Sequence, residues 1–276
     1  MLNIRRIPIS ALAGILVTLL FVLAAIFTPW IAPYPDAAIV GDVWAPASAA
    51  HWLGTDNLGR DLLTRLLYGA RITLFIAFLA TVLSFTLGAS LGFSAAVVGG
   101  WFDELLSRFV DLIMSIPTLI FALVVLSVLP STTLTLILVM GVLDSTRVFR
   151  ISRAVAVDIN VMDFVEAAKL RGEGRLWIIF REILPNALSP LVAELGLRFI
   201  FAILFLSALS FLGLGVQPPN SDWGGMVKDN KEGIVFGIPA ALLPAAAISV
   251  LAISVNLVAD WILNRTTDLK GGRGNG

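Results

Sequence analysis

Long apolar runs recur along the chain, and they constrain its fold more than any other feature. A helix that crosses a bilayer needs about 20 apolar residues, and six runs approach or exceed that length: residues 10–31, 72–98, 109–129, 132–149, 188–213 and 238–263. Charged residues make up only 14% of the chain, compared with about 25% in soluble domains. The sequence therefore predicts an all-α integral membrane protein with six transmembrane helices.

The first apolar run follows a short basic start, which is also the pattern of a secretory signal. A cleaved signal has an apolar core of about 7–15 residues. The run over residues 10–31 is longer than that, and further spans follow it. We therefore expect a first helix that is retained in the membrane.

Lysine and arginine are unevenly distributed over the two sides that these spans define. With a cytoplasmic N-terminus, 13 lie inside and five outside: Arg5, Arg6, Arg108, Arg147, Arg150, Arg153, Lys169, Arg171, Arg175, Arg181, Arg265, Lys270 and Arg273, against Arg60, Arg65, Arg71, Lys228 and Lys231. Cytoplasmic loops carry the excess of positive charge in membrane proteins. The sequence therefore predicts that both termini are cytoplasmic, within residues 1–9 and 264–276.

Two longer segments lie outside the spans. Residues 32–71 form the outer, periplasmic one, which ends in an amphipathic stretch from Leu58 to Tyr68. Residues 150–187 form the inner one and lie between the fourth and fifth spans. The remainder of residues 72–263 is the transmembrane core.

The inner segment has two short runs with helical spacing. The apolar residues of each run recur at i, i+3, i+4 and i+7, which is one face of a helix: Val161, Phe164, Val165 and Ala168, then Leu176, Ile179, Phe180 and Ile183. Gly172 and Gly174 separate the runs, and we expect Pro185 to stop the second one. Helices this short are unstable alone in water, so each must bury its apolar face against the bundle, the lipid surface or a partner protein.

The residues of this segment also carry a family resemblance. The stretch FVEAAKLRGEGRLWIIFREILPN resembles the EAA loop of ABC importer permeases, and the matching residues are Glu166, Ala167, Ala168, Gly172, Ile183, Leu184 and Pro185. It differs from the usual pattern at Glu173 and Gly174, in the turn. The resemblance implies that the loop forms a coupling helix that inserts into a groove on an ATP-binding subunit.

Three further stretches resemble the dipeptide, oligopeptide and nickel class of these permeases, in its second-permease type. They are HWLGTDNLGRDLLTRLLYGAR, GGWFDELLSRFVDLIMSIP and SFLGLGVQPPNSDWGGM. The resemblance implies a type I importer architecture in the bacterial inner membrane, a second homologous permease as partner, two ATP-binding subunits and an extracytoplasmic binding protein. Members of this class import dipeptides, oligopeptides, glutathione, nickel complexes or opine-like conjugates.

Polar residues just before the second span are candidates for an outer gate or a receptor contact, with a plain structural lid as the alternative. They are Asp56, Arg60 and Asp61. We expect Thr55 or Asp56 to cap a helix that starts near Asn57, and an ion pair between Asp61 and Arg65, which are four residues apart.

Charges within the apolar runs are candidates for the translocation path, because such residues usually face a bundle interior or a cavity. They are Asp144, Glu194 and Arg198. Glu194 and Arg198 have the spacing of a helical ion pair, so mutual neutralisation is the alternative. Asp144 with Arg147, and Arg108 with Asp111, allow the same alternative at i, i+3.

The sequence lacks the motifs of several classes of protein. No GxxxxGK[ST] phosphate loop occurs, so ATP and Mg²⁺ are expected on partner subunits and no cofactor on this chain. His51 is the sole histidine and there is no GxSxG elbow, so no catalytic or metal-ligating residue is predicted. The net charge of zero gives no overall attraction to nucleic acid. An ion-coupled secondary transporter, with Pro117 and Pro244 as helix breaks, is the competing class.

Overall fold

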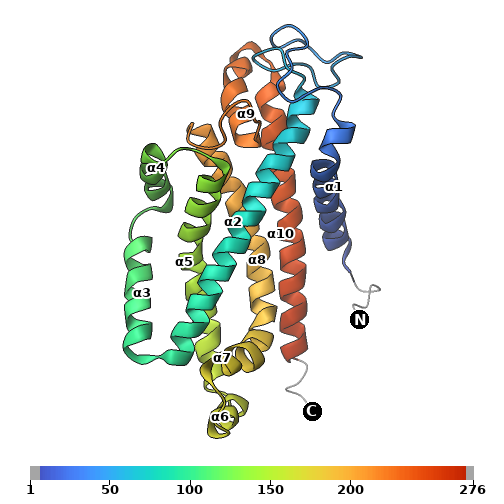
Figure 1. The fold of residues 1–276 in the computed structure, drawn as a ribbon. Helices are drawn as coiled ribbons and strands as arrows, with labels where there is room; N and C mark the ends of the chain where they lie inside the picture. The colour runs from blue at the N-terminus through green and yellow to red at the C-terminus, as the bar shows by residue number, and fades with distance from the viewer. Residues whose placement is uncertain (1–6, 272–276) are drawn as a thin grey trace.

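A computed structural model describes the backbone of residues 7–271 and the side chains of residues 7–263, and it is a bundle of long helices (Figure 1). The predicted cytoplasmic ends, residues 1–9 and 264–276, therefore lie largely outside the described residues. The α-helices are α1 (Ile9–Ile31), α2 (Leu62–Val98), α3 (Gly100–Met114), α4 (Thr118–Val128), α5 (Thr133–Asn160), α6 (Asp163–Leu170), α7 (Arg175–Trp177), α8 (Leu184–Phe211), α9 (Trp223–Asn230) and α10 (Leu242–Gly271). The all-α expectation is confirmed for the described part of the chain, which contains no named strand.

Four helical stretches among the described residues are long and apolar enough to cross a membrane. They are α1, α2, the continuous helix over residues 175–211, and the helix over residues 239–263. The pair α3 and α4 passes the same criterion as a bent fifth span. Helix α5 has 28 residues, but charged residues interrupt its apolar sequence. Length and composition therefore establish four to five spans.

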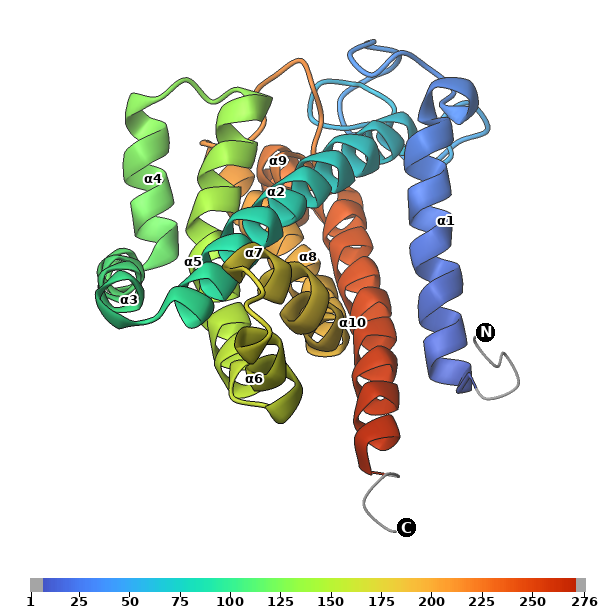
Figure 2. The same ribbon diagram turned by 60° about the horizontal axis from the view of Figure 1, so that its bottom comes forward.

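The two ends of the bundle differ in what they carry. Helix α1 begins and α10 ends at the same end as α6, whereas residues 32–61 lie at the opposite end in both views (Figures 1 and 2). Helix α9 lies toward that opposite end in Figure 1. This is the arrangement that an even number of crossings produces.

Helix α2 begins ten residues earlier than the apolar run predicted. Asp61 is its N-cap, and the Asp61 carboxylate accepts a hydrogen bond from the Thr64 amide. The expected cap at Thr55 or Asp56, with a helix from Asn57, is therefore wrong. The amphipathic stretch from residue 58 contributes the first turns of a single helix of 37 residues, roughly 56 Å long at about 1.5 Å per residue.

Helices α2 and α5 pack with their backbones in contact. A Cβ at Gly88 would lie 2.6 Å from the Ser145 carbonyl oxygen, and one at Gly92 would lie 2.8 Å from that of Phe149. Any side chain larger than hydrogen would separate the two helices. Glycine at these positions therefore allows the close approach of α2 and α5.

The run over residues 109–129 is broken rather than straight. Helices α3 and α4 meet at 81° around Ser115–Pro117. Proline lacks the amide hydrogen and disfavours helical geometry in the residue before it, so the break follows from Pro117. Pro244, in contrast, lies in the first turn of α10, where proline is tolerated.

Helix α3 is tied to α5 by ion pairs that differ from the expected ones. Arg150 contacts Asp111 at 2.7 Å, and the Arg153 guanidinium donates to Asp103. Arg108 pairs with Glu104 at 2.6 Å, one turn away. The expected Arg108–Asp111 pair is therefore wrong, because α5 supplies a cation to Asp111.

Candidate functional site

The inner segment contains two helical pieces joined by a tight turn. Helix α6 ends at Leu170, and Gly172 reverses the chain with a φ of +84°, a conformation that glycine adopts without strain. The amide of Glu173 then donates to the Ala168 carbonyl at 3.2 Å. The predicted pair of short helices around a glycine turn is thus present in the described structure.

The second helical piece does not stop at Pro185, contrary to expectation. Helix α7 passes through a π-helical turn, Ile178–Ile183, directly into α8. Pro185 falls in the first turn of α8, directly after the π-helical turn. The inner segment is therefore connected without interruption to a membrane helix.

The two pieces bury one face and expose the other. Val165 and Ala168 are fully buried, and Val165 belongs to one hydrophobic cluster with Ile178, Ile179 and Ile183. Glu166, Ala167 and Gly172 are exposed, and Leu170 and Leu176 are 84% and 71% exposed. The bundle thus supports one side of this inner helix pair, residues 163–184, and leaves an apolar surface with a carboxylate uncovered.

The charges predicted within the membrane come together as one cluster. Arg198 lies 2.7 Å from Glu194, without hydrogen-bond alignment, and donates to Asp144 at 3.2 Å. Arg147 lies 3.8 Å from Asp144. The Glu194–Arg198 and Asp144–Arg147 ion pairs are therefore confirmed. The contact of Arg198 with Asp144, which joins the two pairs across α5 and α8, was not predicted.

A cavity of about 480 Å³ adjoins this cluster. It lies among α2, α4, α5 and α8, and its lining residues are Ala80, Thr81, Pro117, Thr118, Leu119, Met140, Asp144, Arg147, Phe201, Ala202, Leu204, Phe205 and Ala208. Most of these are apolar. Its polar part is the end where Asp144, Arg147 and Thr118 meet.

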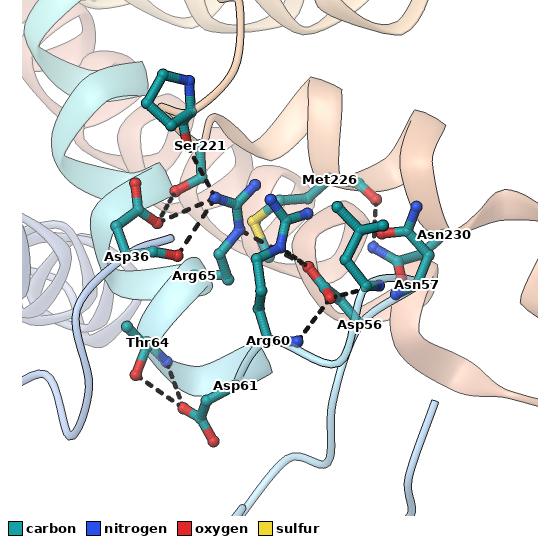
Figure 3. Close-up of polar contacts among 12 residues, drawn as sticks. Asp36, Asp56, Asn57, Arg60, Asp61, Thr64, Arg65, Ser221, Met226 and Asn230 are labelled. Carbon is teal, nitrogen blue, oxygen red and sulfur yellow. Dashed lines mark hydrogen bonds and ion pairs between the residues drawn. The ribbon is translucent and has the colours of Figure 1, made fainter. Parts of the chain in front are cut away.

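The outer candidates are buried in a network of ion pairs and hydrogen bonds (Figure 3). Asp56 accepts from the Arg60 side chain at 2.6 Å and from the Leu58 and Arg60 amides at 2.8 and 2.9 Å. Asp61 accepts from Thr64 and lies 3.1 Å from His51 Nδ1. Asp56, Arg60 and Asp61 are 1%, 7% and 2% exposed, so these side chains do not form an open surface.

The expected Asp61–Arg65 pair is wrong. Arg65 instead donates to Asp36 at 3.2 Å and lies 3.8 Å from Asp56 (Figure 3). The reason is local, because Asp61 is turned back to cap its own helix and cannot also reach forward along it.

Residues distant in sequence complete this outer network. The Asn230 amide oxygen accepts from the Asn57 amide at 3.0 Å and the Trp44 indole at 3.2 Å. Ser221 donates to Asp36 at 2.6 Å. Sequence reasoning missed these residues because their partners lie 173 to 186 positions away, and no local spacing signals such contacts. We call the joined segments, residues 32–61 and 217–230, the outer cap.

Asp222 is a buried carboxylate within the outer cap and outside the spans. It caps α9 by accepting from the Gly224 and Gly225 amides at 3.0 and 3.3 Å. Burial raises the pKa of Asp222 to about 6, against the opposing hydrogen bonds from Ser210 and these amides. The neutral acid is therefore favoured in the folded protein at mildly acidic pH.

We expect this carboxyl to stabilise the fold below its ordinary pKa of 3.8 and to lose that contribution as pH rises through about 6. At about 1.4 kcal/mol per pKa unit, the full difference is on the order of 3 kcal/mol. Thermal unfolding in detergent between pH 4 and 7 measures it, with Asp222→Asn as the matched variant. Equal pH dependence in both proteins would contradict the assignment.

Comparison with known proteins places these features in a family. Residues 88–268 match the family described as binding-protein-dependent transport system inner membrane component. A Brucella suis protein, whose name provisionally assigns it to a peptide transport system, is 39% identical over 90% of this chain and 84% of its own. The dipeptide transport system permease protein DppC of Alkalihalophilus pseudofirmus is 33% identical over 91% and 83%.

A third relative has a different named substrate. The glutathione transport system permease protein GsiD of Pectobacterium atrosepticum is 30% identical over 93% of this chain and 86% of its own. The family match covers the inner helix pair and the helices from α3 to α9 together. The chain therefore belongs to the family of inner-membrane components of binding-protein-dependent transport systems, and it is a multi-pass protein of the bacterial inner membrane.

Proposed function

We propose that this chain is one of two homologous permease subunits of an ATP-driven importer of peptides. The observation that carries the proposal is the inner helix pair, which exposes an apolar surface and the Glu166 carboxylate while its other face is anchored on the bundle. A protein groove lined with apolar side chains and a cation is the natural complement of such a surface. ATP-binding subunits, which carry ATP and Mg²⁺, supply that groove.

In this proposal the chain crosses the membrane six times, with both termini cytoplasmic. The four long apolar helices, the bent pair α3 and α4, and α5 make up the six. Helix α5 packs along α2, which supports its place within the bundle. The excess of lysine and arginine on the side of α6 favours that side as cytoplasmic.

Transport would proceed by alternating access, with the path between this chain and its partner permease. Closure of the two ATPases on ATP draws the inner helix pairs together and opens the path outward, and hydrolysis resets it. The loaded binding protein docks on the outer cap, whose shape the buried residues Asp56, Arg60 and Asp61 maintain. The charges of Asp144, Glu194 and Arg198 then lie near the path.

Peptides are the favoured substrates because relatives along most of the chain carry peptide and dipeptide transport names. Glutathione, the named substrate of a further relative, is itself a peptide derivative. Nickel complexes and opine or sugar conjugates are the alternatives for the same machinery. An ion-coupled secondary transporter is disfavoured because it gives the exposed inner helix pair no partner.

Reconstitution tests the proposal. We expect proteoliposomes with both permeases and two ATPases to hydrolyse ATP faster when the loaded binding protein is added, and to accumulate radiolabelled dipeptide. The same membranes without the ATPases should accumulate none under a proton or sodium gradient. Uptake by this chain alone, driven by such a gradient, would refute the proposal.

A further inference from the structure

The cavity beside the membrane charge cluster has one cation whose hydrogen-bonding capacity is mostly unused. Among the described residues, Arg147 donates one hydrogen bond, from Nη2 to Thr118 Oγ1 at 3.2 Å, although a guanidinium has five N–H donors. Its side chain is 41% exposed and lines the cavity. Its contact with Asp144, at 3.8 Å, is an ion pair without a hydrogen bond.

The neighbouring acids are already occupied by the other arginine. Arg198 is only 11% exposed and approaches both Asp144 and Glu194, at 3.2 and 2.7 Å. The four charges sum to zero, but they are not equally placed, because Arg198 holds both carboxylates and Arg147 faces the open space. The positive charge available at the cavity is therefore that of Arg147.

The rest of the wall suits an anion attached to an apolar body. Helix α4 begins at the cavity with Thr118 and Leu119, directly after its N-cap Pro117, and no side chain among the described residues caps its N-terminus. Its free amides add positive potential to that of the guanidinium. Apart from Thr81 and Asp144, the remaining lining is apolar, and about 480 Å³ falls within the range of roughly 300–1,000 Å³ seen for small-ligand pockets.

We propose that Arg147, supported by Thr118 and the start of α4, binds the terminal carboxylate of the transported peptide in this cavity. The inference rests on the proposed peptide import and adds a recognition point within the membrane. A terminal carboxylate is common to peptides of every sequence, so one cation serves many substrates while the apolar wall accepts their varied side chains. Planar guanidinium and carboxylate groups pair through parallel N–H···O bonds.

The test compares a dipeptide with its C-terminal amide in the reconstituted importer. Alanyl-alanine and alanyl-alanine amide are each supplied at concentrations that saturate the binding protein, so that the permease determines the difference. We expect Arg147→Gln to slow uptake of the free acid by about tenfold or more, the value of one hydrogen bond to a charged group. Uptake of the amide should change less than about twofold, because the amide has no carboxylate for Arg147 to bind.

Two further variants separate recognition from folding. Arg147→Lys retains the charge and should restore part of the preference for the free acid. Arg150 lies three residues after Arg147 in α5 and pairs with exposed Asp111 of α3. Arg150→Gln should therefore leave both rates unchanged. Equal slowing of acid and amide by Arg147→Gln, or slowing of neither, would overturn the proposal.

An anionic lipid headgroup could also pair with Arg147, and changing the lipid composition distinguishes it from the peptide carboxylate. The measurements are repeated in vesicles of phosphatidylcholine alone and in vesicles with phosphatidylglycerol. Acid-selective slowing in both supports the peptide carboxylate, whereas an effect confined to vesicles with phosphatidylglycerol would overturn it. Failure of the wild-type complex to import either peptide would instead count against peptide import itself.

Discussion

Replacing Glu166 with alanine is expected to weaken docking of the ATPase by on the order of 30-fold, since truncating one partner of a buried interfacial charge pair costs about 2–5 kcal/mol. Glu166 is exposed and forms no ion pair with the described residues, so the permease itself should fold normally. Transport and receptor-stimulated ATP hydrolysis should fall together. Co-purification of the ATPases and ATPase assays in proteoliposomes measure both.

The matched control is Asp158→Ala, which removes an exposed carboxylate near the end of α5, outside the inner helix pair. It should leave docking and transport intact. Gly172→Val offers a second route to the same loss, because a β-branched residue at a φ of +84° is strained. Normal assembly and transport by both Glu166→Ala and Gly172→Val would refute the docking assignment.

Replacing Asp56 with alanine is expected to be the most destabilising single change in the outer cap. The substitution leaves the buried Arg60 guanidinium without its hydrogen-bonded carboxylate. It also removes the carboxylate that lies 3.8 Å from Arg65. Breaking a buried pair in this way costs about 3–5 kcal/mol, which corresponds to a fall in Tm on the order of 10 °C. Thermal unfolding of the purified protein in detergent measures the fall.

An exposed pair in the same chain provides the comparison. Glu104 and Arg108 lie at 2.6 Å, close to the separation of the Asp56–Arg60 pair, but they are 64% and 76% exposed. Because water screens such a pair, Glu104→Ala should leave the Tm unchanged. Similar shifts for Asp56→Ala and Glu104→Ala would contradict the view that burial gives the outer network its strength.

The lengths of the apolar runs predicted membrane helices, and helical spacing predicted the paired inner helices, because each signal is contained in a short stretch of chain. It could not locate their ends where tertiary contacts decide them. Asp61, for example, has the spacing to pair with Arg65, yet capping α2 and contacting His51 use its oxygens. Arg65 instead forms an ion pair with Asp36, which is 29 positions away in the sequence.

The candidate sites show the same division. Pairings within one helix, such as Glu194 with Arg198, were predictable from spacing. The cross-helix contact of Arg198 with Asp144 was not, nor was the meeting of Arg147 with Thr118, because each depends on how separate helices pack. Pro185 was misjudged because sequence alone does not reveal the π-helical turn that precedes it.

The backbone contact between α2 and α5 limits how the protein can change shape. Gly88 and Gly92 lie against the carbonyl groups of α5, so sliding or rotating one helix past the other would force side chains into those positions. The two helices must therefore move as a rigid body. Because α2 reaches from the outer cap to the inner end (Figures 1 and 2), a tilt imposed at one membrane face would be transmitted to the other.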